Sequence, residues 1–298
     1  MRVFVTGATG FIGSAVISEL IGAGHQVLGL ARSDEGARRL TAAGADVHRG
    51  SLEDLDGLRS GTAAADGVIH LAFIHDFSQY LEAAAADQRA IEAMGSVLAG
   101  SNRPLVVTSG LAGFAPGRAA TEEDVPAHFA RVSEQAALAL VPQGVRAMVV
   151  RLAASVHDAG DRGFVPYLIG LARQKGEAAY IGEGLNRWPA VHRRDAARLF
   201  RLALEQGVAG ARYHGAADEG IALRDLAAVI GRHLQVPVVS KPAEAAEAHF
   251  DWMARFAGLD MAASSALTQQ WLGWHPTHPG LLADLEHGDY FEPASPRA

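Results

Sequence analysis

Apolar residues follow two different spacings along the first half of the chain. Short runs such as RVFV at 2–5 and VIHLAF at 68–73 are almost continuously apolar, which is typical of strands buried on both faces. Between them, longer segments carry apolar residues every three or four positions, as amphipathic helices do. The spacings predict strands at 2–7, 25–32, 45–50, 66–73, 103–110 and 145–152, and helices at 11–24, 34–44, 52–63, 77–100 and 126–144.

Strands that alternate with helices in this order predict a parallel sheet covered on both sides, which is the doubly wound, Rossmann-type α/β fold. The second half is less regular, with helical spacing near 164–175, 194–206, 223–234, 244–258 and 264–272. We expect residues 1–152 to form a dinucleotide-binding core. Residues 153–298 should form mostly a smaller substrate-binding lobe, with segments that return to the core.

Composition narrows the function classes. The formal charge is −7, which argues against nucleic acid as a partner because phosphate binding needs a basic face. The chain has no cysteine, so thiol catalysis, disulfides and thiolate metal sites are excluded. Neither a signal-peptide pattern nor an apolar run of membrane-spanning length is present. We therefore expect a cytoplasmic protein that contacts neither membrane nor nucleic acid.

A glycine-rich turn joins the first predicted strand to the first predicted helix. VFVTGATGFIG places Gly7, Gly10 and Gly13 at this junction. Such a turn needs glycine because it is tight, because its backbone must approach a pyrophosphate, and because the helix must pack near the strand. The helix amino terminus then offers free N–H groups to the phosphates. The turn therefore predicts a dinucleotide site.

The end of the second predicted strand indicates which dinucleotide is bound. NAD sites usually carry Asp or Glu there, bonded to the ribose 2′-hydroxyl, whereas this sequence reads GLARSD. Arg32 and Ser33 occupy the position, and a guanidinium can hold a 2′-phosphate with paired hydrogen bonds. We therefore predict NADP. Asp34 follows directly and could bond a ribose, so NAD is the alternative.

Several motifs together resemble the extended and atypical branches of the short-chain dehydrogenases/reductases, which include the NAD-dependent epimerase/dehydratases. The resemblance covers nearly the whole chain. It rests on TGATGFIG, GSLEDL, VIHLAF, VVTSG, VVRLAASVHDAG, AVHRRDAARLF and LGWHPT. It implies that the cofactor is contacted by Thr9, Phe11 and Ile12 of the glycine turn, by Ser51 and Leu52, by Leu71 and Ala72, and by Thr108.

The catalytic pair of the resembling family is missing. In that family a Tyr transfers the proton and a Lys four residues later lowers the pKa of the Tyr. The segment HFARVSEQAAL puts Ala130 and Glu134 at these two positions, and neighbouring Phe129 has no hydroxyl. A carboxylate cannot supply the positive field that depresses a phenol pKa. Any catalytic group must therefore come from elsewhere in the chain.

Three residues are candidates for the displaced chemistry. Ser109 ends the fifth predicted strand and could bond a substrate carbonyl, or it could serve only the turn before Gly110. His75, next to Asp76, follows the fourth strand and could supply a proton near neutral pH. Tyr167 could replace the missing phenol or pack on a helix face.

Other polar residues have weaker claims. Further candidates for the substrate region are His157, Asp158, Asn186, Arg187, Trp188 and His192, with Trp188 equally suited to a core. His275 and His278 lack a third ligand, so no metal site is expected. Glu122 and Glu123 look like part of a solvated acidic stretch.

Our leading hypothesis is an NADP(H)-dependent oxidoreductase that reduces a carbonyl or related unsaturated bond of a small organic molecule. One alternative is a redox sensor or regulator that binds NADP without turnover. Another is an epimerase or isomerase that uses the nicotinamide transiently. The resemblance also suggests a homodimer through the helices near 78–100 and 126–142, where small residues permit close approach. These residues are Ala84, Ala85, Ala136 and Ala137.

Overall fold

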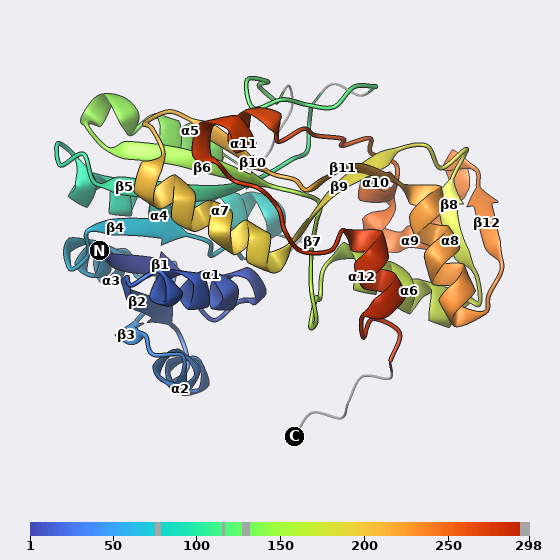
Figure 1. Cartoon of the computed structure of the whole chain (residues 1–298), viewed down its shortest axis with the longest axis horizontal. Helices are drawn as coiled ribbons and strands as arrows, with labels where there is room; N and C mark the ends of the chain where they lie inside the picture. The colour runs from blue at the N-terminus through green and yellow to red at the C-terminus, as the bar shows by residue number, and fades with distance from the viewer. Residues whose placement is uncertain (75–78, 115–116, 127–131, 293–298) are drawn as a thin grey trace.

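The computed structural model describes residues 1–74, 79–114, 117–126 and 132–292 (Figure 1). Its centre is a seven-stranded parallel sheet in the order β10-β6-β5-β4-β1-β2-β3. The order reverses between β1 and β4, which is where open α/β sheets bind ligands. The strands are β1 (Arg2–Thr6), β2 (Gln26–Ala31), β3 (Asp46–Arg49), β4 (Gly67–His70), β5 (Pro104–Gly110), β6 (Arg146–Leu152) and β10 (Arg212–Gly215).

Helices cover both faces of this sheet, so the predicted fold class is confirmed. One core cluster joins Val106 of β5 to α1 and α7. The opposite cluster joins Leu105 and Val107 to the helices of the other face, because successive side chains of a strand point to opposite sides. The helices are α1 (Phe11–Gly22) and α7 (Arg193–Gln206) on the first face, with α3 (Leu55–Ala63), α4 (Tyr80–Leu98) and α5 (Ser133–Leu138) on the second, and α2 (Asp34–Ala42) between β2 and β3.

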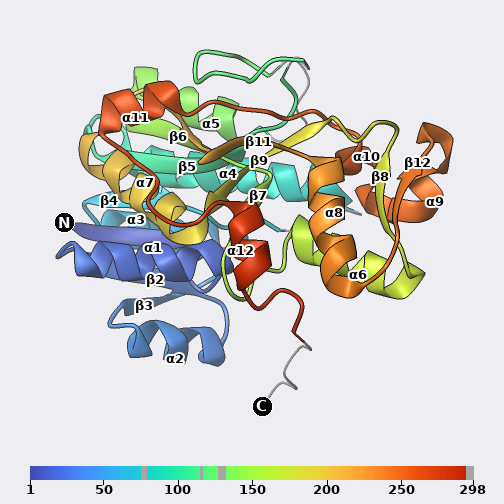
Figure 2. The ribbon, with the colours of Figure 1, turned by 45° about the vertical axis from the view of Figure 1, so that its right-hand side comes forward.

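A smaller lobe stands at the end of the sheet, with its own apolar cluster (Figures 1 and 2). Its strands are β7 (Ser155–His157), β9 (Arg187–His192) and β11 (Asp218–Ala222) in one sheet, and β8 (Ala178–Ile181) and β12 (Val238–Lys241) in another. Its main helices are α6 (Phe164–Lys175), α8 (Leu223–Leu234), α9 (Ala246–Phe250), α10 (Ala254–Ala257) and α12 (Leu281–His287). The neighbouring α11 (Ala266–Leu272) contacts β10 and α7 instead.

Segments of the second half pack against the large sheet. Strand β10 pairs with β6, and α7 lies along α1. Trp274 is fully buried in the same apolar cluster as α1 and donates its indole N–H to the backbone oxygen of Asp195, 2.9 Å away. The sheet is therefore completed by residues that are far from its first strands in sequence.

Two local predictions were wrong. The expected helix at 244–258 is broken at Asp251, whose φ of 51° lies in the left-handed region. Leu81, an apolar residue of the helix predicted at 77–100, is 74% exposed rather than buried as amphipathic spacing would have it. Of the alanines at the suggested dimer face, Ala84, Ala136 and Ala137 are buried within the chain, where α4 packs on α5. None of the described helices is long and apolar enough to cross a membrane.

Candidate cofactor site

The glycine turn has no room for larger residues. Gly7 has a φ of 66°, and a Cβ there would lie 2.7 Å from the backbone nitrogen of Ala72. A Cβ on Gly13 would lie 2.1 Å from the backbone oxygen of Gly7. Gly10 precedes α1 without a side-chain cap, so the first amides of α1, at Phe11 and Ile12, keep N–H groups that can donate hydrogen bonds to an anion. The turn therefore fits a pyrophosphate.

Two guanidinium groups surround the end of β2. Arg32 is exposed directly after the strand. Arg49, at the end of neighbouring β3, donates to the backbone oxygen of Ser33 at 2.5 Å and pairs with Asp34. The Ser33 hydroxyl accepts a hydrogen bond from the amide of Gly36 at 3.1 Å and so caps α2. Asp34 is thus already paired, and the place where a 2′-phosphate would lie is basic.

Sequence reasoning missed Arg49 because it considered the end of β2 alone. The two strands are paired, with Ala31 opposite Arg49 in the register. Neighbouring parallel strands end at one edge of the sheet. The signal was the position of Arg49 at the end of its own predicted strand.

The other predicted cofactor residues follow the same sheet edge. Leu71 and Ala72 lie against Gly7, and the Thr108 hydroxyl donates to the backbone oxygen of His70 at 2.8 Å. Leu52 packs with the apolar cluster of its face, and the Ser51 hydroxyl accepts a bond from the amide of Glu53 at 3.3 Å. Thr9 is placed near the start of α2, since its methyl group would lie 3.2 Å from a Cβ on Gly36.

A buried polar chain ties four elements together behind this edge. The Thr6 hydroxyl lies 2.8 Å from His70 Nδ1, and His70 Nε2 lies 3.0 Å from Asp87 Oδ1. Ser133 donates its hydroxyl hydrogen to the other oxygen of Asp87. All four side chains are at most 1% exposed. A buried network with all its hydrogen bonds made holds its elements in place. These hydrogen bonds therefore position α4 and α5 against β1 and β4.

Glu134, which the sequence analysis aligned with the family lysine, is held by two arginines. Arg151 Nε and Nη2 donate to its two oxygens at 2.8 and 2.7 Å, and Arg212 Nε donates at 2.6 Å. Burial alone would raise the pKa of Glu134, but the two arginines outweigh it and lower the pKa. Arg151 is fully buried, and its Nη1 lies 3.1 Å from His214 Nε2. Burial lowers the pKa of His214 to about 4. Glu134 therefore serves as the centre of a structural ion cluster.

The structure does not bring the three candidate catalytic residues together within its described part. Ser109 lies opposite Arg151 in the strand register and is 3% exposed, and within the described chain its hydroxyl has no hydrogen-bond partner. Tyr167 lies in the lobe with its ring centroid 5.0 Å from that of Trp252. Burial and then Asp251 raise the pKa of Tyr167, so its phenol stays protonated. His75, Asp76, Phe129 and Ala130 lie outside the described residues.

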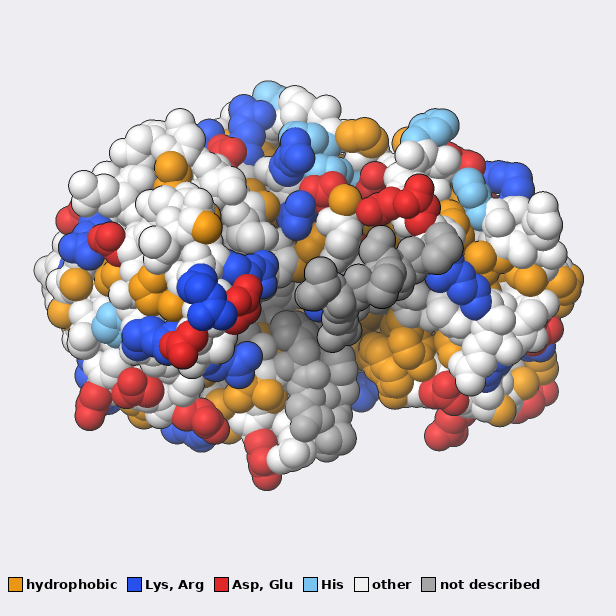
Figure 3. All heavy atoms as spheres, turned by 90° about the horizontal axis from the view of Figure 1, so that it is seen from below, with side chains coloured by type: hydrophobic (Ala, Val, Ile, Leu, Met, Phe, Trp, Pro, Cys, Tyr) orange, Lys and Arg blue, Asp and Glu red, His pale blue; other side chains and the backbone are white. Residues whose placement is uncertain are grey.

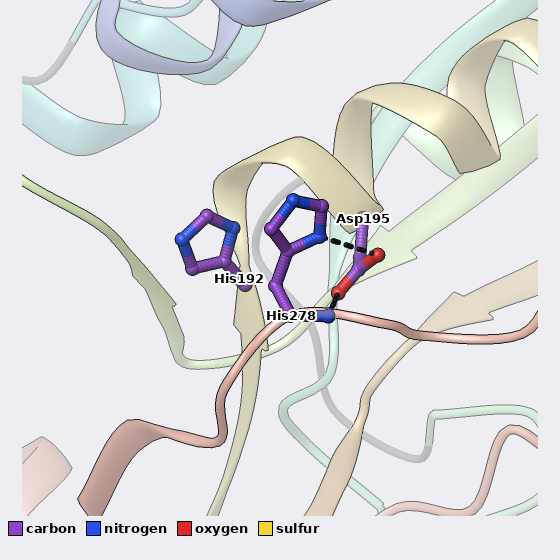
Figure 4. A group of neighbouring side chains, drawn as sticks. All are labelled: His192, Asp195 and His278. Carbon is purple, nitrogen blue, oxygen red and sulfur yellow. Dashed lines mark hydrogen bonds and ion pairs between the residues drawn. The ribbon is translucent and has the colours of Figure 1, made fainter. Parts of the chain in front are cut away.

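Two histidines and one aspartate, His192, His278 and Asp195, join the segment before α12 to the start of α7 (Figure 4). The rings of His192 and His278 are stacked at 4.5 Å, with an angle of 6° between their planes. Asp195 accepts hydrogen bonds from the amides of Thr277 and His278 and lies 3.0 Å from His278 Nδ1. An imidazole binds a metal in the plane of its ring, and two stacked planes share no such point. These contacts therefore have a structural role: they hold the start of α7 against the segment at Thr277 and His278.

Four further residues from the sequence analysis have structural roles. Glu122, expected in a solvated stretch, is 2% exposed and accepts bonds from the Thr268 amide and hydroxyl. Arg187 forms two hydrogen bonds to Asp260, at 3.0 and 2.8 Å. Asn186 donates to backbone oxygens at residues 257 and 259. Trp188 is 1% exposed and belongs to the lobe core.

Comparisons with known proteins agree with this arrangement. The pattern of the NAD dependent epimerase/dehydratase family matches residues 3–101. An uncharacterized protein of Schizosaccharomyces pombe is 50% identical over 295 residues, which cover 98% of this chain and 100% of the relative. An uncharacterized protein of Saccharomyces cerevisiae is 46% identical over 96% of this chain and 98% of the relative.

A solved structure shows the shared fold at lower identity. The dTDP-glucose 4,6-dehydratase of Streptomyces venezuelae, determined with NAD bound, superposes with a TM-score of 0.75 at 18% identity over 96% of each chain. Its sheet and lobe therefore have the same overall arrangement as those described above.

Proposed function

Because the chain belongs to the NAD-dependent epimerase/dehydratase family, we propose that it is an oxidoreductase that uses NADP(H) to reduce a carbonyl or related unsaturated bond of a small organic molecule. The observation that carries the cofactor choice is the pair of guanidiniums, Arg32 and Arg49, beside Ser33. The nearby carboxylate of Asp34 is neutralised by Arg49. A 2′-phosphate would therefore meet positive charge rather than repulsion.

The reaction is placed at the carboxyl ends of β5 and β6. Bound NADPH supplies the hydride. Ser109 lies at this edge, and within the described chain its hydroxyl has no hydrogen-bond partner, so we propose that it orients the substrate oxygen and donates a hydrogen bond to it. Tyr167, with its raised pKa, can serve as a second donor but not as a base. His75 remains our candidate for the proton source, since the pair at 130 and 134 supplies none.

The lobe favours an apolar substrate. Phe164 lies 5.0 Å from Phe256, and Tyr167 lies at the same distance from Trp252, measured between ring centroids. Trp252 is 44% exposed. Figure 3 shows hydrophobic side chains gathered on the lobe side of the face viewed from below. Arg187, the arginine of β9, is occupied by Asp260. These contacts support an aromatic or aliphatic carbonyl compound as the substrate.

A cofactor titration followed by a turnover screen tests the proposal. We expect calorimetry to show NADPH binding at least tenfold more tightly than NADH, since each lost charge-assisted contact costs roughly 1.5–3 kcal/mol. Arg32→Gln and Arg49→Gln should each remove most of that preference, whereas Arg38→Gln, an exposed arginine of α2, should not. NADPH oxidation should then follow with a panel of aldehydes, ketones and enones. Equal binding of the two cofactors would contradict the NADP assignment.

A second candidate is a redox sensor that binds NADP without turnover. The observation that favours it is Glu134, which lies in the ion cluster with Arg151 and Arg212 and cannot act as the family lysine does. Tight NADPH binding without oxidation of NADPH across the whole panel would select this alternative. An epimerase or isomerase ranks lower, because in the family that reaction also uses the missing Tyr.

A further inference from the structure

Arg193 stands at the phosphate-facing end of α1. It is the first residue of α7, and its guanidinium carbon lies 4.5 Å from the ring centroid of Phe11. Phe11 is the first residue of α1 and follows Gly10 of the glycine turn. A phenylalanine ring lies within about 5 Å of its own amide nitrogen, by covalent geometry. The guanidinium therefore lies within roughly 10 Å of the amides that would meet a pyrophosphate.

One edge of this guanidinium is fixed by a carboxylate. Arg193 Nε and Nη2 donate to Asp158 Oδ2 at 3.2 and 2.9 Å. Asp158 is itself held, because its Oδ1 accepts the amide of Ala159 at 2.7 Å and lies 3.5 Å from His192 Nε2. The Arg193 side chain is only 21% exposed. Its conformation is thus set before any ligand arrives, so little side-chain entropy would be lost on binding.

The other edge of the guanidinium is available. Within the described chain, Arg193 Nη1 has no hydrogen-bond partner. The charge of Asp158 is also shared, since Arg194 Nε lies 3.9 Å from the same oxygen. A guanidinium that uses one edge for a carboxylate can offer the other to a phosphate. The helix dipole of α1 attracts the same anion.

We propose that Arg193 binds the diphosphate of the cofactor and that Asp158 is its positioning residue. This inference rests on the proposed function, because it concerns the same cofactor. It assigns a part of the site to α7, which lies more than a hundred residues after the glycine turn. The competing explanation is that Arg193 only fastens α7 to α1 and to the segment after β7.

Ligand fragments separate these two explanations. Arg193→Met keeps an apolar stem over Phe11 and removes the charge. The matched control is Arg194→Met, at an adjacent arginine that is 67% exposed. Calorimetric affinities are measured for three ligands. NADPH and 2′-phospho-ADP-ribose both contain the diphosphate. Adenosine 2′,5′-bisphosphate has single phosphates at its 2′ and 5′ positions and therefore lacks the diphosphate. Thermal unfolding of each variant reports on the fold.

We expect Arg193→Met to lower the affinity for NADPH and for 2′-phospho-ADP-ribose by about tenfold or more, which is the usual cost of a lost charged hydrogen bond. Its affinity for adenosine 2′,5′-bisphosphate should change less than about threefold, because this ligand has no diphosphate. All affinities of Arg194→Met should also change less than about threefold, because Arg194 is not proposed to contact the cofactor. The loss should shrink as salt rises, since screening weakens charge pairs.

Two results would overturn the inference. One is an Arg193→Met protein that binds NADPH as wild type does. The other is an equal loss for all three ligands, which would mark a structural role. If Arg193→Met does not fold, Arg193→Gln is measured in the same way, and affinities equal to wild type for every ligand would count against the proposal. Wild-type protein that binds neither NADPH nor NADH would instead refute the proposed function.

Discussion

The glycine turn after β1 and the region of α5 and β6 use charge in opposite ways. At the glycine turn, backbone amides and the arginines Arg32 and Arg193 keep N–H groups that can donate hydrogen bonds to a ligand. At α5 and β6, the charged groups of Glu134 and Arg151 are directed at one another. The first region is arranged for an anion from outside, whereas the second satisfies its charges within the chain.

The second region shows how charged side chains are held in a buried place. Buried charges are stable only when they are paired and hydrogen-bonded. Once a carboxylate occupies position 134, it needs cations, and the strands supply Arg151 and Arg212. The cluster then stabilises the junction of β6, β10 and α5, and the glycine turn is unaffected. Three experiments test this division between a ligand-directed region and a self-satisfied one.

The largest effect is expected when the charge at position 134 is reversed. Glu134→Lys would bring a third cation against Arg151 and Arg212 in a buried place. We expect the free energy of unfolding to fall by about 5 kcal/mol or more, because an uncompensated buried charge is strongly destabilising. Urea unfolding measures the change. Glu123→Lys, at an exposed carboxylate, is the control and should change stability by less than about 0.5 kcal/mol.

A Glu134→Lys protein of wild-type stability would contradict the view that this region is self-satisfied. Recovery of turnover without loss of stability would show instead that position 134 faces the reaction. Either outcome would remove the contrast between the two regions.

The second effect is expected at the glycine turn. Gly13→Ala places a Cβ 2.1 Å from the backbone oxygen of Gly7, so the turn must shift. We expect a loss of about 4 kcal/mol, shared between stability and cofactor affinity, since backbone contacts of this kind cannot relax cheaply. Calorimetry with NADPH and urea unfolding measure the two parts together.

Gly22→Ala is the matched control within α1, because a Cβ there meets no atom within 4 Å. Alanine should raise the stability of this exposed helical position by up to about 1 kcal/mol. If Gly13→Ala behaved like Gly22→Ala, the close fit of the turn would carry no functional meaning.

The third effect is a pH dependence of the stability that the ion cluster provides. Burial lowers the pKa of His214 to about 4, well below the unfolded value of about 6.5. The stabilisation by neutral His214 is therefore complete above about pH 6.5 and is lost as the pH falls toward 4. The loss should reach about 3 kcal/mol, since each unit of pKa shift corresponds to about 1.4 kcal/mol.

His214→Gln isolates this contribution from that of the acidic residues. The Gln side chain keeps a donor and an acceptor but does not titrate near these pH values. Urea unfolding between pH 7 and 4.5 should give a shallower decline for His214→Gln than for wild type. Parallel declines would mean that protonation of His214 does not limit the stability of the cluster.

The sequence by itself determined the fold class and predicted the sheet edge of the candidate cofactor site. Both follow from local spacing: the alternation of strands and helices fixes the parallel sheet, and the glycines fix the turn after β1. Even the helix at 164–175 was predicted to the residue. Short-range signals of this kind are readable because they depend only on neighbours along the chain.

Only the tertiary structure decided which polar groups meet. Glu134 and Arg212 are 78 positions apart, and Phe11 contacts Arg193 across two helices. Such pairs are set by strand order, register and helix packing, and the spacing of residues carries no trace of them. The same holds for Glu122, which looked solvated in sequence but is buried against Thr268. Local pattern thus placed the cofactor edge, while the meeting of distant strands and helices decided which charges remain for a ligand.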